Sequence, residues 1–221
     1  MRTFRSFLSQ QALVRTASLA LPLAAVTVLP ACDLFNQVAA AAQNAANISV
    51  DETESTNVSL DVSALTGALA GQPAPAPGLP QDLALPPVAV DLNKSQPNIA
   101  KYANGHIVTL EINKIAVTPS SNTLTADLPA LDIYFGPTTA KTPADGIKVA
   151  TIPPIKAGST TAVDATIDAA AMTQAGTKYL STLAFSQIMD GKLVIATGGM
   201  VPGGKVDLKL DLGLHAVVTP L

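Results

Sequence analysis

The chain has 221 residues, a formal net charge of −3 and a single cysteine. This length suits one sizeable domain with appendages better than two ordinary domains. Aromatic residues make up 4% of the chain and tryptophan is absent, which argues against a surface that stacks sugars or bases.

Charge is distributed unevenly along the chain. The three arginines, Arg2, Arg5 and Arg15, lie in the first fifteen residues, and the first acidic residue is Asp33. From Cys32 onward ten lysines face sixteen acidic residues, so the formal charge of this part is 10 − 16 = −6. An acidic body repels backbone phosphates, and we therefore expect no nucleic-acid partner.

The N-terminal segment has the layout of a secretory signal. Residues 1–16 carry the positive charge, and residues 17–29 form an uncharged, mostly apolar run of 13 residues. A helix that spans a bilayer needs about 20 apolar residues, so a cleaved signal is favoured over a permanent transmembrane helix.

The end of this run, Leu29-Pro30-Ala31-Cys32, resembles the lipobox of bacterial lipoproteins. The resemblance implies that residues 1–31 are removed by cleavage between Ala31 and Cys32. It also implies that the Cys32 thiol carries diacylglycerol and that the new amine carries an acyl chain. No other cofactor is expected. Asp33 stands where some lipoproteins carry a sorting signal for the inner membrane.

A lipid on Cys32 would account for a lone cysteine in an exported protein, because a thioether is inert where a free thiol is not. Two or three acyl chains give stable anchoring where a single chain is marginal. We expect a location in the bacterial cell envelope, with the domain in the periplasm or outside. The choice between inner and outer membrane stays open. An ordinary signal cut after Ala31 and an organellar transit peptide are the alternatives.

After Cys32 the chain begins with an alanine-rich stretch and then changes to alternating patterns. Residues 32–50 are expected to be a flexible or partly helical tether. In residues 57–65 the side chains of Val58, Leu60, Val62 and Ala64 share one face, which predicts a half-buried strand. The Pro-rich residues 66–87 are expected to form an extended, polyproline-like connection across a sheet edge.

Further strands are predicted where short apolar runs lie between turn residues. In residues 106–117, Val108, Leu110 and Ile112 share a face, but the apolar phase then shifts to Ile115 and Val117, so a β-bulge is predicted near Asn113 and Lys114. Residues 205–217 alternate most regularly. The other predicted strands are residues 87–92, 131–135, 147–152, 161–167 and 192–197.

Turns and one helix complete the expected elements. A short helix is predicted in residues 168–185, with Asp168 as N-cap and an apolar face of Met172, Ala175, Tyr179 and Leu183. Turns are predicted at Asn104-Gly105, Asp145-Gly146, Asp190-Gly191, Gly198-Gly199 and Pro202-Gly203-Gly204.

These elements predict an all-β domain over residues 51–221, an antiparallel β-sandwich of Ig-like or jelly-roll type with one short helix. The stretches LDIYFGP (131–137) and GIKVATIPPI (146–155) resemble paired strands of uncharacterised exported bacterial lipoproteins.

Candidates for chemistry are few. His106 and His215 are expected to be surface residues rather than zinc ligands. Asp51, Glu52 and Glu54 fit an exposed strand better than a calcium site. Asp164 and Asp168 are a weak candidate for the paired catalytic carboxylates of a glycosidase. No metal site and no enzymatic activity are expected.

The expected function is that of a lipid-anchored envelope protein with a non-catalytic structural or interaction domain. It would contact the membrane through its anchor and an envelope protein through the domain. The alternative is a module that binds a small apolar ligand or a lipid.

Overall fold

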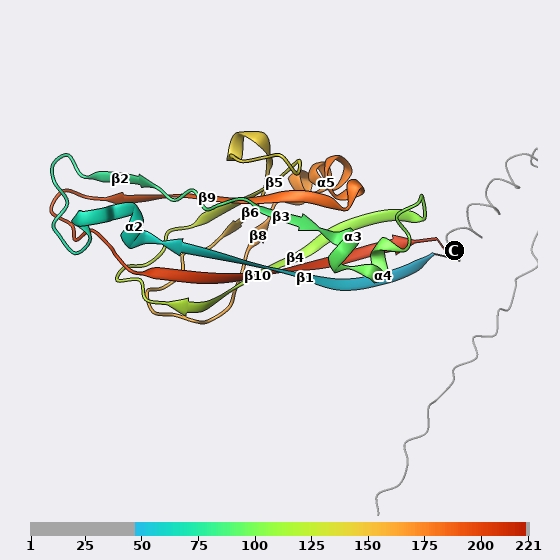
Figure 1. Ribbon diagram of the computed structural model, residues 1–221, viewed down its shortest axis with the longest axis horizontal. Coiled ribbons are helices and arrows are strands. Elements are labelled where there is room, and N and C mark those ends of the chain that lie inside the picture. The colour runs from blue at the N-terminus through green and yellow to red at the C-terminus, as the bar shows by residue number, and fades with distance from the viewer. Residues whose placement is uncertain (1–46, 220–221) are drawn as a thin grey trace, which may run out of the picture. The chain divides into compact units, whose positions relative to one another are not determined.

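A computed structural model describes residues 47–219, and its strands form two antiparallel sheets that pack as a β-sandwich (Figure 1). The predicted all-β fold class is confirmed. The expected signal peptide, the Ala31–Cys32 cleavage site, Asp33 and most of the expected tether lie outside the described residues.

The first sheet has four strands in the order β1-β10-β4-β7. They are β1 (Ile48–Asp61), β10 (Lys205–Val218), β4 (Ile107–Asn122) and β7 (Val163–Asp164). The second sheet has the order β2-β9-β5-β6-β8, and β3 also pairs with β9. Its strands are β2 (Leu79–Asp82), β3 (Val88–Asp91), β5 (Leu131–Gly136), β6 (Ile147–Ile152), β8 (Thr166–Ile167) and β9 (Ala184–Ile195).

Strand β10 confirms the clearest alternating pattern of the sequence. It pairs along its whole length with β1, from Lys205 opposite Asp61 to Val218 opposite Ile48. On its other side it pairs with β4. Every second side chain points into the core and is almost fully buried: Val206, Leu208, Leu210, Leu212, Leu214, Ala216 and Val218.

Strand β4 contains the predicted bulge. The pairing passes from Lys114 opposite Gly213 to Ile112 opposite Leu214, so Asn113 has no partner on β10. The extra residue restores the inward direction of Ile115 after Ile112, as a bulge should. A second register shift leaves out Val108 in the same way. Val108 therefore does not share the inward face as predicted, and its side chain is 53% exposed.

Strand β1 differs from the predicted strand at both ends. It begins at Ile48, within the stretch that the sequence assigns to the tether, and stops at Asp61. There the Asp61 side chain accepts a hydrogen bond from the Ala64 N–H (2.9 Å) and starts the short helix α2 (Val62–Thr66). The inward positions Val58 and Leu60 are buried as predicted, but Ala64 is exposed.

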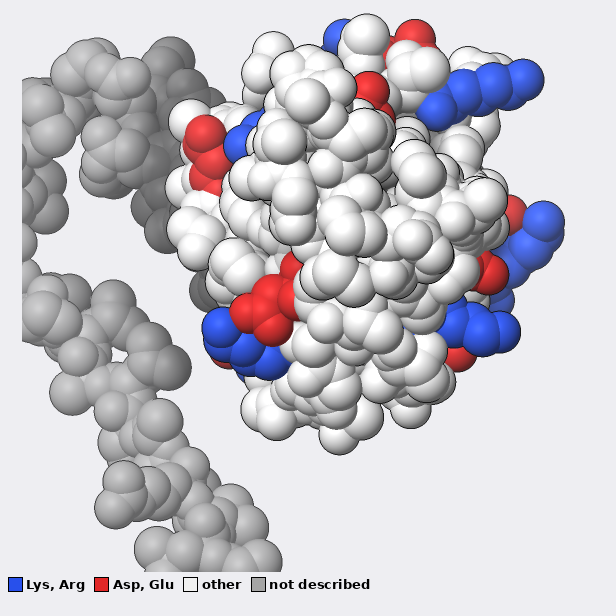
Figure 2. Space-filling view, turned by 90° about the vertical axis from the view of Figure 1, so that its left-hand side faces the viewer, with Lys and Arg blue, Asp and Glu red and all other residues white. Residues whose placement is uncertain are grey.

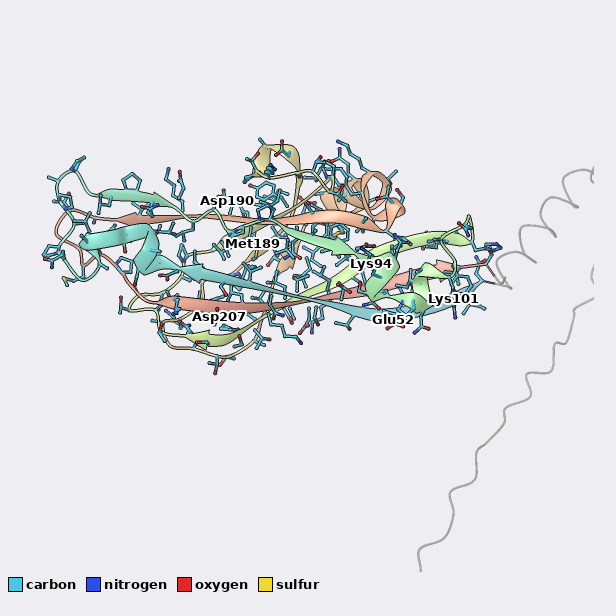
Figure 3. All side chains as sticks on the ribbon, viewed as in Figure 1. Glu52, Lys94, Lys101, Met189, Asp190 and Asp207 are labelled. Atoms are coloured by element: carbon cyan, nitrogen blue, oxygen red, sulfur yellow. The ribbon has the colours of Figure 1, made fainter. Side chains whose placement is uncertain are left out.

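Strand β9 is longer than predicted, and the turn predicted at Asp190-Gly191 is wrong. The strand runs straight through these residues, with Asp190 opposite Asp132 and Gly191 opposite Leu131 of β5 (Figure 3). A Cβ on Gly191 would lie 2.5 Å from the Leu131 Cδ2 atom. The glycine therefore admits a close side-chain neighbour in the sheet instead of making a turn.

The predicted strand 161–167 is divided between the two sheets. Val163 and Asp164 pair with β4, whereas Thr166 and Ile167 pair with β6. Helix α5 (Ala169–Lys178) then follows, and the Asp168 side chain caps it by accepting from the Ala171 N–H (3.0 Å), as predicted. The helix is shorter than the predicted range because a 3₁₀ turn (Leu180–Thr182) leads into β9. The apolar face predicted for the helix is buried: Met172, Ala175, Tyr179 and Leu183.

The Pro-rich segment runs along one edge of the second sheet, as predicted, but it also contains a strand that was not predicted. After a 3₁₀ turn (Gly67–Leu69), β2 pairs with the C-terminal part of β9, and β3 pairs with the N-terminal part of the same edge. The short helices α3 (Leu92–Ser95) and α4 (Pro97–Ala100) follow β3, and a 3₁₀ turn (Pro143–Asp145) joins β5 to β6.

Candidate functional site: an apolar groove and an uncharged end

A groove of about 820 Å³ runs between the first half of β4 and helix α5. Consecutive residues 107–113 of β4 line it, because β7 pairs with β4 only at Ala116 and Val117. Within the described residues, this part of β4 is paired with β10 alone and forms an open sheet edge. Gly176 of α5 lies beside this edge, because a Cβ placed on it would be 3.7 Å from the Leu110 carbonyl oxygen.

Apolar side chains form most of the groove wall. Leu110 and Ile112 from β4 and Met172 from α5 are buried, and Ile167 from β8 is half-buried. Val108 projects at the opening because its bulge position leaves it without a partner on β10. A concave surface of this size with a mainly apolar lining is typical of a site for a small molecule.

Three hydroxyl groups line the helical side of the groove at intervals of four residues. They belong to Thr173, Thr177 and Ser181. Each donates its proton to the carbonyl oxygen four residues earlier, at 2.9, 3.2 and 3.0 Å respectively. Their oxygen lone pairs remain available as acceptors on the groove side.

The second surface feature is an uncharged end of the domain. Residues 62–81 and 193–204 contain no ionisable side chain, and they meet through the Pro73–Met200 bridge and the pairing of β2 with β9. Four large apolar side chains in these segments are exposed: Leu65, Leu69, Val194 and Met200. Viewed from this side, most of the surface is uncharged, and the charged side chains lie around its margin (Figure 2).

The opposite end, where β1 begins, is charged. Glu52, Lys94 and Lys101 lie in that half of the domain (Figure 3). There Gln96, between α3 and α4, donates from Nε2 to the Glu54 carboxylate (2.8 Å) and to the Thr53 carbonyl (3.0 Å). Asn98 donates to Glu52 (2.7 Å). These bonds hold the two short helices against the edge of β1.

The acidic and histidine residues singled out from the sequence do not converge. Asp51 contacts the Nδ1 atom of His215 (2.7 Å), and Glu52 accepts from the Asn98 amide. Glu54 is not exposed as predicted, because its side chain is buried where it accepts from the Gln96 amide. His106 contacts the Thr219 hydroxyl (3.2 Å). Asp164 pairs with Lys114 (3.4 Å), whereas Asp168 caps α5. Among residues 47–219, no group of three His, Cys, Asp or Glu side chains is placed to hold a metal ion.

The titratable groups with shifted pKa values lie outside the groove lining, and each shift has a local cause. The Lys156 ammonium (2.6 Å) and the Ala157 N–H lower the pKa of Asp127. The Ser55 hydroxyl and the Lys209 ammonium lower the pKa of Asp211. Burial raises the pKa of Tyr134. These are the effects of surface pairs and sheet packing.

No helix in the described part of the chain is long and apolar enough to cross a membrane.

The sequence matches no protein-family model and no curated protein. Among solved structures, the chain is similar to a chain of turnip yellow mosaic virus, with 10% identity, a TM-score of 0.30 and coverage of 94% of this chain and 92% of that chain. A chain of Desmodium yellow mottle tymovirus is similar at 10% identity and a TM-score of 0.21, with coverage of 100% and 98%. Similarity at this level carries no argument about family or function.

Proposed function

We propose that this chain is a lipid-anchored protein of the bacterial cell envelope whose β-sandwich is a non-catalytic structural or interaction module. Leu29-Pro30-Ala31-Cys32 supports the anchor through its resemblance to a lipobox. The start of β1 at Ile48 leaves residues 33–47 as the connection between Cys32 and the sandwich.

The observation that carries the interaction role is the uncharged end. The body after Cys32 has a formal charge of −6, yet residues 62–81 and 193–204 hold no charge and expose Leu65, Leu69, Val194 and Met200. Exposed apolar groups that gather in one place mark interaction surfaces more often than singly scattered ones do. Ile48 lies at the opposite end of the first sheet, where it pairs with Val218, so this surface faces away from the point where the chain enters the sandwich.

The anchor is tested by Cys32→Ser in cells fed labelled palmitate. We expect the variant to lose essentially all label and to leave the membrane fraction, because serine offers no thiol for the thioether. The parent chain is the control. Palmitate labelling of the variant equal to that of the parent would rule out Cys32 as the attachment site.

The interaction surface is tested by a photocrosslinking amino acid placed at Met200. Met200 is 63% exposed, so the replacement does not disturb the core. We expect discrete crosslinked products from this position in intact cells and none of them from the matched exposed position Asn57 on β1. The same set of products from both positions would show random collision and count against the proposal.

The groove favours a second function, the binding of a small apolar ligand or a lipid. Its volume of about 820 Å³ and its apolar wall of Leu110, Ile112 and Met172 support this candidate. Its test is combined with that of the ligand class below.

A further inference from the structure

We propose that the groove between β4 and α5 binds an apolar molecule whose polar end is not anionic and forms hydrogen bonds, as that of a long-chain alcohol or amine does. This inference rests on the second function proposed above and adds the chemical class of the ligand.

The charges of the residues that line the groove disfavour an anionic ligand. Glu111 is the one ionisable residue among the described lining residues, and no lysine, arginine or histidine belongs to the lining. An anionic head group would enter a mainly apolar site that offers no cation to offset its lost hydration and whose one ionisable lining residue is acidic. A neutral or cationic head group avoids both costs.

The lysines nearest in sequence to the lining are engaged elsewhere. The Lys114 ammonium pairs with Asp164 at 3.4 Å. The Lys178 ammonium lies 5.2 Å from the centre of the Tyr179 ring. Neither residue lines the groove, so neither supplies the positive site that a fatty acid or a phospholipid phosphate requires.

The groove lining also offers neutral groups that can form hydrogen bonds with the polar end of a ligand. Thr173, Thr177 and Ser181 each donate to a carbonyl oxygen four residues earlier, and each hydroxyl oxygen can still accept a hydrogen bond. The open β4 edge adds backbone N–H donors and carbonyl acceptors without adding charge. A polar end that both donates and accepts, as a hydroxyl group does, matches this set.

The ligand class is tested with three photoreactive probes of the same chain length, one an alcohol, one an amine and one a carboxylic acid. Cells expressing the full chain are irradiated with each probe, and labelled peptides are identified by mass spectrometry. Labelling is normalised to that of total membrane protein. We expect the alcohol and the amine to label peptides containing residues 107–113 and 169–181, and the carboxylic acid to label them at least tenfold less.

Two variants locate the site. Val108→Glu places a second carboxylate at the groove opening, on a bulge residue that is 53% exposed. Asn57→Glu adds a carboxylate at an exposed position of β1, outside both the groove and the uncharged end, and serves as the control. Gly176→Leu fills the groove without adding charge, because a Cβ at Gly176 meets only the Leu110 oxygen at 3.7 Å and Leu180 at 4.0 Å. We expect Val108→Glu to reduce alcohol labelling and Gly176→Leu to reduce labelling by both probes, each at least tenfold, while Asn57→Glu leaves it unchanged.

The outcomes separate the two claims. Carboxylic-acid labelling equal to or stronger than alcohol labelling, and lost in Gly176→Leu, would overturn the ligand class but keep the groove as a binding site. Absence of groove labelling by all three probes, or labelling that Gly176→Leu and Asn57→Glu leave equally unchanged, would overturn the binding function itself.

Discussion

Gly204→Ala is expected to destabilise the protein by at least about 3 kcal/mol, because the residue combines a left-handed backbone with a crowded position. Its φ is +88°, and an added Cβ would overlap the backbone carbonyl oxygen of Thr123. The Gly204 N–H also donates a hydrogen bond to the Ser63 hydroxyl (2.6 Å) just before β10. This bond opposes a backbone shift that would relieve the overlap.

The matched control for this change is Gly158→Ala. Gly158 has a φ of +69°, but no atom lies within 4 Å of the added Cβ. Only the backbone strain of about 1–2 kcal/mol is expected there. Urea unfolding of both purified variants measures the difference, and equal losses would show that the close approach of residues 123–124 to Gly204 is absent.

Leu210→Ala is expected to cost about 2–5 kcal/mol, the range for removing a fully buried leucine side chain from a core. Leu210 is 0% exposed and lies at the centre of the first sheet, with Thr56 of β1 on one side and Val117 of β4 on the other. Neighbours on two strands limit how far the sheet can relax into the space left behind.

Val194→Ala provides the comparison for Leu210→Ala. Val194 also lies in a strand, but its side chain is 72% exposed, so a change within about 0.5 kcal/mol is expected. Equal destabilisation by the two substitutions would contradict the assignment of the inward face of β10.

Alternation along the chain predicted those strands whose two faces differ in environment. β10 was predicted almost to its ends because each inward leucine is followed by a polar residue or a glycine that faces outward. The phase change after Ile112 predicted the bulge at Asn113, because a residue must be added to keep Ile115 facing the core.

Local signals failed where tertiary contacts decide the conformation. Asp190-Gly191 has the composition of a turn, but pairing with Asp132 and Leu131 extends β9 through it. Residues 161–167 read as one strand, yet Ala165 falls where the chain passes from one sheet to the other. Val62–Thr66 continues the alternation of β1, yet the Asp61 side chain starts a helix there.

The two candidate surfaces differ in how far the sequence could reveal them. The uncharged end was visible as two long segments without ionisable residues, 62–81 and 193–204, although only the fold shows that they meet. The groove had no such signal. It exists because β7 stops after pairing with two residues of β4 and because α5 passes beside the open edge, and strand length and helix position are not encoded in local periodicity.

The most direct test of the proposed anchor is the intact mass of the protein extracted from membranes of cells that express the full chain. We expect a polypeptide that begins at Cys32 and carries the added mass of one diacylglycerol and one amide-linked acyl chain. A mass equal to that of an unmodified chain, whether it begins at Met1 or at Cys32, would contradict it.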